Sequence, residues 1–173
     1  MQRIYIVGYA MNDTIENLKK EIDKINWLQY REAYSGTGEK IAVYLKDLLC
    51  GYGSAKLEAI KTLHASVCHQ DIAVEAVALP SFDFLMYALL NFDDRIKTEL
   101  LWMLSAFAMC ISEDVDTIKA DYPIDLASEI ILDNIRLREK FMANVEVFKG
   151  FSSHPNKDIA HFSREICDYI AGE

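Results

Sequence analysis

Hydrophobic residues recur every three to four positions along most of this chain, the spacing that gathers side chains on one face of an α-helix. These runs predict helices over residues 13–28, 41–49, 54–67, 72–78, 84–90, 100–111, 123–148 and 159–170. The apolar residues 4–7 form either a short strand or an extended segment, and the pattern leaves both open. The chain is therefore predicted to be almost wholly helical.

Two of the predicted helical hairpins have matching apolar positions when one is shifted by 41 residues. The matched positions are Leu48, Leu49, Ile60, Leu63 and Val67 in the first hairpin and Leu89, Leu90, Leu101, Leu104 and Ala108 in the second. A period of about 40–47 residues is typical of two-helix solenoid repeats. A fainter third copy consists of Ile159, Ile166 and Ile170, which lie 59 residues after Leu100, Phe107 and Ile111.

Hairpins with one apolar face each must stack to bury it, so we expect an all-α fold, a right-handed HEAT-like α-solenoid of antiparallel helix pairs. One domain, 1–173, would contain an N-terminal segment and helix (1–34), two hairpin repeats (35–112), an acidic loop (113–122) and a C-terminal helical pair (123–173). The long helix of the last pair is expected to turn inward the residues Ile124, Ala127, Ile131, Ile135, Met142 and Val145.

Several short motifs lie within and just before residues 34–108. They are Ala33-Tyr34-Ser35, Leu45-x-x-Leu48-Leu49, Ala59-Ile60-x-x-Leu63, Cys68-His69-Gln70-x-Ile72-Ala73, Pro80-Ser81-Phe82-Asp83-Phe84-Leu85 and Leu89-Leu90. With them the segment resembles small bacterial HEAT-repeat immunity proteins, which are found beside polymorphic or contact-dependent growth-inhibition toxins. The chain departs from that group's pattern at Asp71, where glycine is usual, and in the three residues between Pro80 and Phe84. The resemblance implies neutralisation of a toxin by binding, without catalysis.

Composition narrows the class of partner. A content of 51% hydrophobic and 26% charged residues is typical of a folded domain, and 7 Gly and 3 Pro are too few for a turn-rich β fold. The net charge of −9 opposes binding to nucleic-acid phosphates, which is driven by Lys and Arg. It also disfavours a HEAT-like DNA-repair glycosylase, which needs a basic concave surface. We therefore expect a basic protein partner, and no nucleic acid or membrane.

The negative charge is concentrated in one segment. Residues 113–133 hold two thirds of the net charge, in Glu113, Asp114, Asp116, Asp121, Asp125, Glu129 and Asp133, opposed only by Lys119. The last three acids follow at i, i+4 and i+8 and are expected on one helix face, where like charges cost about 0.2–0.5 kcal/mol per pair. Either this is a solvated helix face, or it is a surface that steers a basic partner and mimics the phosphates that a nuclease grips.

Trp102 is a second candidate for partner binding. With Thr98, Ser105 and Met109 it forms a stripe beside the apolar face of its helix. Second helices of solenoid repeats tend to line the concave surface, and tryptophan is enriched among the residues that anchor interfaces. The alternative is that the indole packs between repeats.

The sequence predicts no catalytic, cofactor or metal site. It lacks the GxGxxG, GxxxxGK[ST], HExxH and GxSxG motifs. His64 and Cys68, at i and i+4, supply only two possible metal ligands, and His69 is expected to cap a helix C-terminus. The four cysteines, Cys50, Cys68, Cys110 and Cys167, contain no CxxC pair and are expected to be reduced and buried.

Residues 1–7 lack the pattern of a signal peptide, and the longest apolar stretch, residues 100–111, is too short to span a bilayer, so a cytoplasmic location is expected. Together with the family resemblance, these observations predict an immunity protein that binds the C-terminal domain of a cognate toxin. The acidic charge of the expected interface favours a nuclease as that toxin. The alternative is a HEAT-like adaptor or scaffold in a larger cytosolic assembly. The oligomeric state is left open.

Overall fold

The structure, a computed structural model, describes residues 11–31, 38–69, 73–113 and 115–172. The expected strand at residues 4–7 lies outside these ranges. The elements in chain order are α1 Met11–Lys24, η1 Trp27–Gln29, α2 Glu39–Cys50, α3 Ser54–Val67, β1 Cys68–His69, β2 Ala73–Val74, α4 Ala78–Asn91, α5 Asp94–Ile111, α6 Val115–Asp121, α7 Ile124–Ala143, α8 Val145–Phe151 and α9 Lys157–Ala171. The all-α prediction is confirmed, since the two strands are an antiparallel pair of only two residues each.

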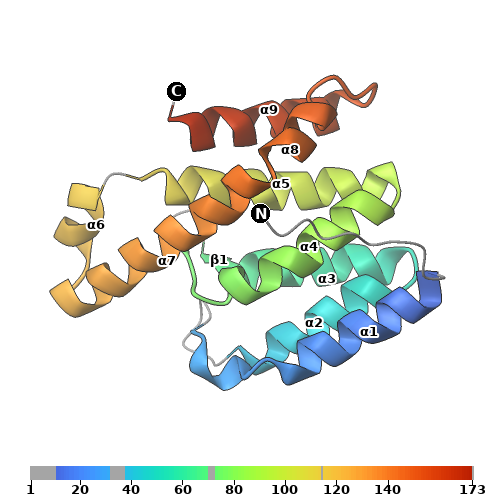
Figure 1. The fold of residues 1–173 in the computed structure, drawn as a ribbon, viewed down its shortest axis with the longest axis horizontal. Coiled ribbons are helices and arrows are strands. Elements are labelled where there is room, and N and C mark those ends of the chain that lie inside the picture. The colour runs from blue at the N-terminus through green and yellow to red at the C-terminus, as the bar shows by residue number, and fades with distance from the viewer. Residues whose placement is uncertain (1–10, 32–37, 70–72, 114, 173) are drawn as a thin grey trace.

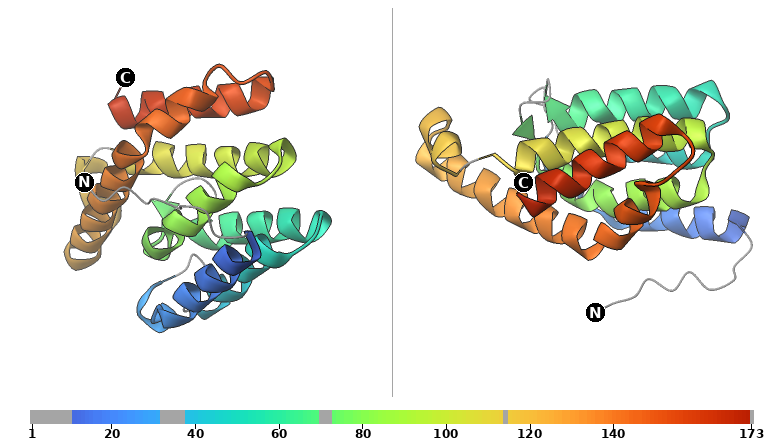
Figure 2. Two further views of the ribbon diagram at one scale, coloured as in Figure 1. Left: turned by 45° about the vertical axis from the view of Figure 1, so that its right-hand side comes forward. Right: turned by 90° about the horizontal axis from the view of Figure 1, so that it is seen from above.

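The helices lie in two rows (Figure 1). One row is α3, α5 and α9, with α5 packed between the other two. The second row is α2, α4 and α7, with α4 in the middle, and α1 covers α2. α5 also contacts α4 and α7, which joins the rows, and Figure 2 shows α9 lying over α5. The two central helices, α4 and α5, therefore have neighbours on most sides.

One hydrophobic core runs through both rows, from Ile22 in α1 to Ile170 in α9. Both members are buried in four of the five aligned residue pairs of the two hairpins. The exception is Leu49 with Leu90, because Leu90 lies on the exposed side of the last turn of α4. The sequence period thus identified hairpins whose buried positions correspond.

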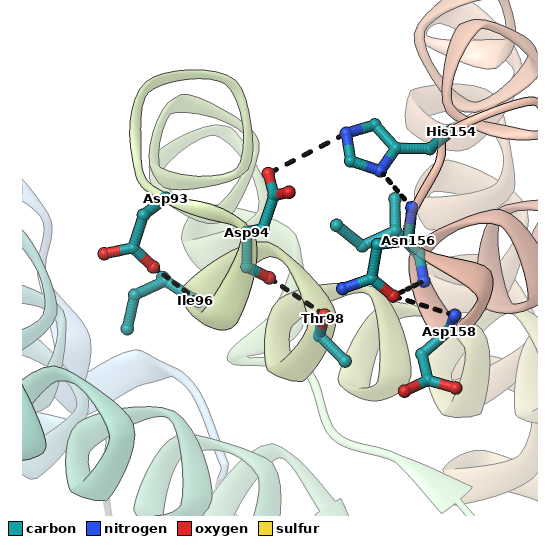
Figure 3. A network of polar contacts seen from close by, with 8 residues as sticks. Asp93, Asp94, Ile96, Thr98, His154, Asn156 and Asp158 are labelled. Atoms are coloured by element: carbon teal, nitrogen blue, oxygen red, sulfur yellow. Dashed lines mark hydrogen bonds and ion pairs between the residues drawn. The ribbon is translucent and has the colours of Figure 1, made fainter.

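Polar contacts tie the start of α5 to the turn before α9 (Figure 3). The Asp93 carboxylate accepts a hydrogen bond from the Ile96 N–H at 3.1 Å and caps α5. His154 Nε2 lies 3.7 Å from Asp94 Oδ1, and His154 Nδ1 accepts from the Asn156 N–H at 3.2 Å. Asn156 in turn caps α9, so both helices begin at one polar cluster.

The expected acidic loop over residues 113–122 is wrong, because most of it is the helix α6. Val115, Ile118 and Tyr122 follow at i, i+3 and i+7, which gives this short segment one apolar side despite its charge. Ile118 is buried, and α6 packs against α7. The acidic segment is therefore held against the domain.

Several predicted helix bounds are also wrong. α1 ends at Lys24 instead of residue 28, and α4 and α5 begin at Ala78 and Asp94, six residues earlier than expected. The helix expected over residues 72–78 is replaced by β2 and the turn before α4, where the Glu75 N–H donates to the Val67 carbonyl at 2.8 Å. The helix expected from Pro123 to Phe148 ends at Ala143. Asn144 leaves the helical backbone region, its side chain donates to the Lys140 carbonyl at 2.8 Å, and α8 follows.

Candidate partner-binding surface

α7 carries apolar residues on two sides, and one of these sides faces the core. Ala127, Leu137 and Phe141 are buried. The Phe141 ring lies edge-on to Phe82 of α4, with centroids 4.9 Å apart, and 5.7 Å from Phe148 of α8. These aromatic contacts fix the rotation of α7 about its own axis.

Much of the side of α7 that was expected to face inward faces solvent instead. Ile124 is 80% exposed, and Ile135 and Met142 are each 51% exposed, so the inward prediction is wrong for these three residues. At about 100° per residue, they and the partly exposed Ile131 fall within about 40° of one another around the helix. We call these four residues, Ile124, Ile131, Ile135 and Met142, the outer apolar stripe.

Exposed carboxylates lie on α6, on α7 and in the connection between α5 and α6. They are Glu113 in the connection, Asp116 and Asp121 of α6, and Asp125 and Glu129 of α7, and we call these five residues the acidic surface. Asp114 lies outside the described residues. Lys119, the one basic residue in the segment, lies 4.0 Å from Asp116 within α6. Five of the seven candidate acids are thus exposed to solvent.

Asp133 is turned away from the acidic surface. Each i, i+4 step rotates by about 40°, so Asp133 is about 80° round the helix from Asp125. Its side chain is 29% exposed and lies 3.5 Å from the Arg136 guanidinium. Burial raises the pKa of Asp133, and the attraction of Arg136 opposes this rise. The expectation that three carboxylates share one exposed face therefore holds for Asp125 and Glu129 only.

Residues far away in the sequence extend this surface. Glu75 Oε2 accepts a hydrogen bond from Arg31 Nε at 3.0 Å. Burial raises the pKa of the Tyr122 phenol, and the nearby charges of Glu75, Glu113 and Asp121 raise it further. The charge of Glu75 thus acts on the same phenol as two carboxylates of the acidic surface, and the charge of Arg31 opposes them. Nothing in the local sequence around Glu75 indicates this proximity.

A shallow cavity opens between α5, α6 and α7. It has a volume of about 110 Å³ and is lined by Ile111, Glu113, Val115, Ile118, Ile131, Asn134, Ile135 and Arg138. At about 30 Å³ per water molecule, the space equals three to four waters, about the size of one branched aliphatic side chain. Two residues of the outer apolar stripe, Ile131 and Ile135, belong to its wall, so the stripe and the cavity are continuous.

Trp102 lies on a different part of the molecule. Its indole is 38% exposed and meets the His64 ring of α3 edge-on, with centroids 4.5 Å apart. Trp102 precedes Glu113 by eleven residues, which is about 16 Å along a helix. It packs against a neighbouring helix and keeps an exposed edge, but it does not join the acidic surface.

The histidine and cysteines near Trp102 do not form a reactive site. Cys68 Sγ lies 3.7 Å from Cys110 Sγ, and this contact together with burial raises the pKa of Cys68, which disfavours the reactive, metal-binding thiolate. Within the described ranges no group of three or more His, Cys, Asp or Glu residues is placed to hold a metal ion. Cys50 is exposed, so the prediction that all four cysteines are buried is wrong.

No family model, curated protein or solved structure matches this chain. None of the helices in the described ranges is both long and apolar enough to cross a bilayer.

Proposed function

We propose that this protein is a non-catalytic immunity protein, which binds the basic C-terminal domain of a cognate toxin in the cytoplasm and blocks its activity. The observation that carries the proposal is the acidic surface. Five exposed carboxylates lie in the connection before α6, on α6 and in the first turns of α7, and Lys119 is the one basic residue among them in the sequence. The resemblance of residues 34–108 to bacterial HEAT-repeat immunity proteins supports the same function.

The charge of this surface suits a nuclease. A nuclease holds the phosphate backbone of its substrate with Lys and Arg side chains, so carboxylates spaced along two helices offer those side chains an alternative set of anions. Charge complementarity of this kind raises the rate of association by about 10- to 1,000-fold and falls with ionic strength. Blocking then follows from occupying the substrate groove.

We also propose that the two rows of helices are a short HEAT-like solenoid. The hairpins α2–α3 and α4–α5 stack so that α2 meets α4 and α3 meets α5. α9 continues the row of second helices, as the faint third copy of the repeat in the sequence predicts. α7 extends the row of first helices, and α6 with the first turns of α7 carries the acidic surface at one side of the solenoid.

The function is tested by expressing the protein encoded by the adjacent upstream reading frame, which we expect to kill cells unless this chain is co-expressed. Failure of rescue contradicts the proposal and favours the adaptor alternative. In purified form, the triple variant Asp121→Asn, Asp125→Asn and Glu129→Gln is expected to associate with the toxin domain about tenfold more slowly at low salt, and with a flatter salt dependence.

A triple variant with the same change in net charge serves as the control. Asp47→Asn, Glu58→Gln and Asp168→Asn alter exposed carboxylates on α2, α3 and α9. We expect the control to associate within about twofold of the unmodified protein, because the charges that steer a partner are those nearest the interface. An equal loss of association rate in both triples would show that net charge, and not the acidic surface, steers the partner.

A further inference from the structure

The outer apolar stripe is the largest feature of α7 that neither the core nor the acidic surface explains. Its four residues lie at i, i+7, i+11 and i+18, so they form one line about 27 Å long at 1.5 Å per residue. Exposed apolar area arranged in a continuous line with polar edges is characteristic of a binding site. The core contacts of Phe141 lie about 100° round α7 from the stripe, so the stripe is not part of that aromatic packing.

The cavity between α5, α6 and α7 adjoins the outer apolar stripe. Ile131 and Ile135 contribute to both, and Val115, Ile118 and Ile111 supply further apolar wall from α6 and the end of α5. Val115 and Ile135 are both substantially exposed, and Glu113, Asn134 and Arg138 supply the polar part of the wall. An aliphatic side chain that enters the cavity from a partner would bury its own surface and that of both residues.

The exposed carboxylates near the stripe favour a basic partner. Asp125 and Glu129 follow α7 on one side, and Asp116 and Asp121 are exposed on α6, which packs against the same helix. A second copy of this chain would bring carboxylates against carboxylates, and an anionic membrane would be repelled. A straight apolar line beside an acidic surface is complementary to an α-helix that has one apolar face and a basic flank.

We propose that the partner of this protein docks a basic amphipathic helix along the outer apolar stripe of α7 and inserts one aliphatic side chain into the cavity between α5, α6 and α7. This inference rests on the proposed function, since it specifies which structure of the basic partner meets the acidic surface. In this proposal the acidic surface sets the association rate, and the apolar contacts of the stripe set the dissociation rate.

The probe is a synthetic peptide of leucine and lysine, about 18 residues long to match the stripe, with its leucines at helical i, i+3, i+4 and i+7 spacing. Two control peptides are compared with it: one of identical composition with the leucines distributed around the helix, and one with glutamate in place of lysine. Binding to the full chain is measured by fluorescence anisotropy of the labelled peptides. We expect the amphipathic lysine peptide to bind at least about tenfold more tightly than either control peptide.

The decisive variant is Ile135→Ser, with Val43→Ser on α2 as the matched control, because both parent side chains are about half exposed. Full burial of an isoleucine is worth about tenfold or more in affinity, so Ile135→Ser is expected to weaken binding of the amphipathic peptide by about that factor. Val43→Ser is expected to change it by less than about twofold. Ile124→Ser, at the most exposed position of the stripe, provides a second variant that leaves the cavity wall intact.

The failures of the two proposals are distinguishable. If Ile135→Ser and Ile124→Ser bind as well as the unmodified chain while the acidic triple variant binds more weakly, the helix-docking inference is overturned and the acidic interface stands. If the lysine peptides bind no better than the glutamate peptide, both the helix-docking inference and the acidic interface are overturned. Dimerisation in sedimentation equilibrium that Ile135→Ser abolishes, or binding to phosphatidylglycerol vesicles, would assign the stripe to another occupant and overturn the inference.

Discussion

The carboxylate of Asp133 lies near two guanidinium groups, those of Arg136 and Arg31, and still has a raised pKa. The loss of hydration on burial therefore outweighs the attraction of both arginines. Asp125, two turns earlier on the same helix, is exposed and keeps its hydration. Ionisation of Asp133 therefore opposes folding, whereas Asp125 is exposed and available to a partner.

A raised pKa in the folded state means that folding favours the neutral form of Asp133. The ionised form then costs stability above the folded-state pKa, and this cost disappears as the pH falls below the unfolded-state pKa, about 3.9. Asp133→Asn is therefore expected to increase the free energy of unfolding at about pH 7 and to leave it unchanged near pH 3. Urea denaturation at both pH values measures this, with Asp125→Asn as the exposed control. An equal gain at both pH values would contradict the pKa shift.

At this scale the sequence was informative about which residues are charged and less so about where they point. The acidic cluster was visible from charge counting, and most of its members are exposed. The orientation of Asp133 does not follow from the sequence. Residues at i and i+8 are rotated by about 80° around a helix, and the contacts of Phe141 with Phe82 and Phe148 decide which part of that arc faces the core. Trp102 retains features of both predicted alternatives, since it packs on His64 and remains partly exposed.

The beginnings of α5 and α7 show two ways of starting a helix. α5 begins with the Asp93 cap, whose side chain satisfies the Ile96 N–H, whereas α7 begins at Pro123 with no side-chain hydrogen bond to its first turn. Proline lacks an N–H and holds the φ angle that a helix requires. The central helix is thus fixed by a hydrogen bond, and the peripheral one by backbone restriction and by its packing.

Asp93→Ala is expected to lower the free energy of unfolding by about 1 kcal/mol, because a first-turn N–H loses its partner. Asp93→Asn retains a capping oxygen and is expected to stay within a few tenths of a kcal/mol of the parent. Chemical denaturation of both variants measures the difference. A loss of the same size in Asp93→Asn would assign the effect to charge instead of the cap.

The existence of most helices follows from periodicity, whereas the rotation and the ends of α7 do not. Its sequence offers two apolar stripes of similar strength, and only contacts with α4 and α8 select between them. The stop at Asn144 depends on one side-chain hydrogen bond to Lys140. α6 was missed because three apolar residues in a highly acidic stretch give a weak local signal.

The molecule as a whole is held by one core that passes through both rows of helices. Trp27 lies near the N-terminal helices, where its Nε1 donates to the Ile22 carbonyl at 2.8 Å, and Trp102 lies in the central helix α5. The 41-residue period related the hairpins α2–α3 and α4–α5, and a separate 59-residue offset related α9 to α5, which it contacts. The Arg31–Glu75 contact and the docking of α6 on α7 join segments that no local pattern relates.

A continuous core predicts a single cooperative unfolding transition, although solenoids are able to unfold repeat by repeat. Trp27→Phe and Trp102→Phe each leave one tryptophan, which reports on its own region. Within each variant we expect the fluorescence and far-UV circular dichroism curves in urea to coincide. Separate midpoints in either variant would show that the N-terminal helices and the central hairpin unfold independently.

The contrast between α4 and α7 bears on how this protein is able to change during evolution. Nearly every side of α4 is buried, so a substitution there disturbs packing and threatens the fold. The outer half of α7 is in contact with solvent, and substitutions there leave the core intact. New partner preferences can therefore accumulate on α6 and α7 while the stacked hairpins stay unchanged.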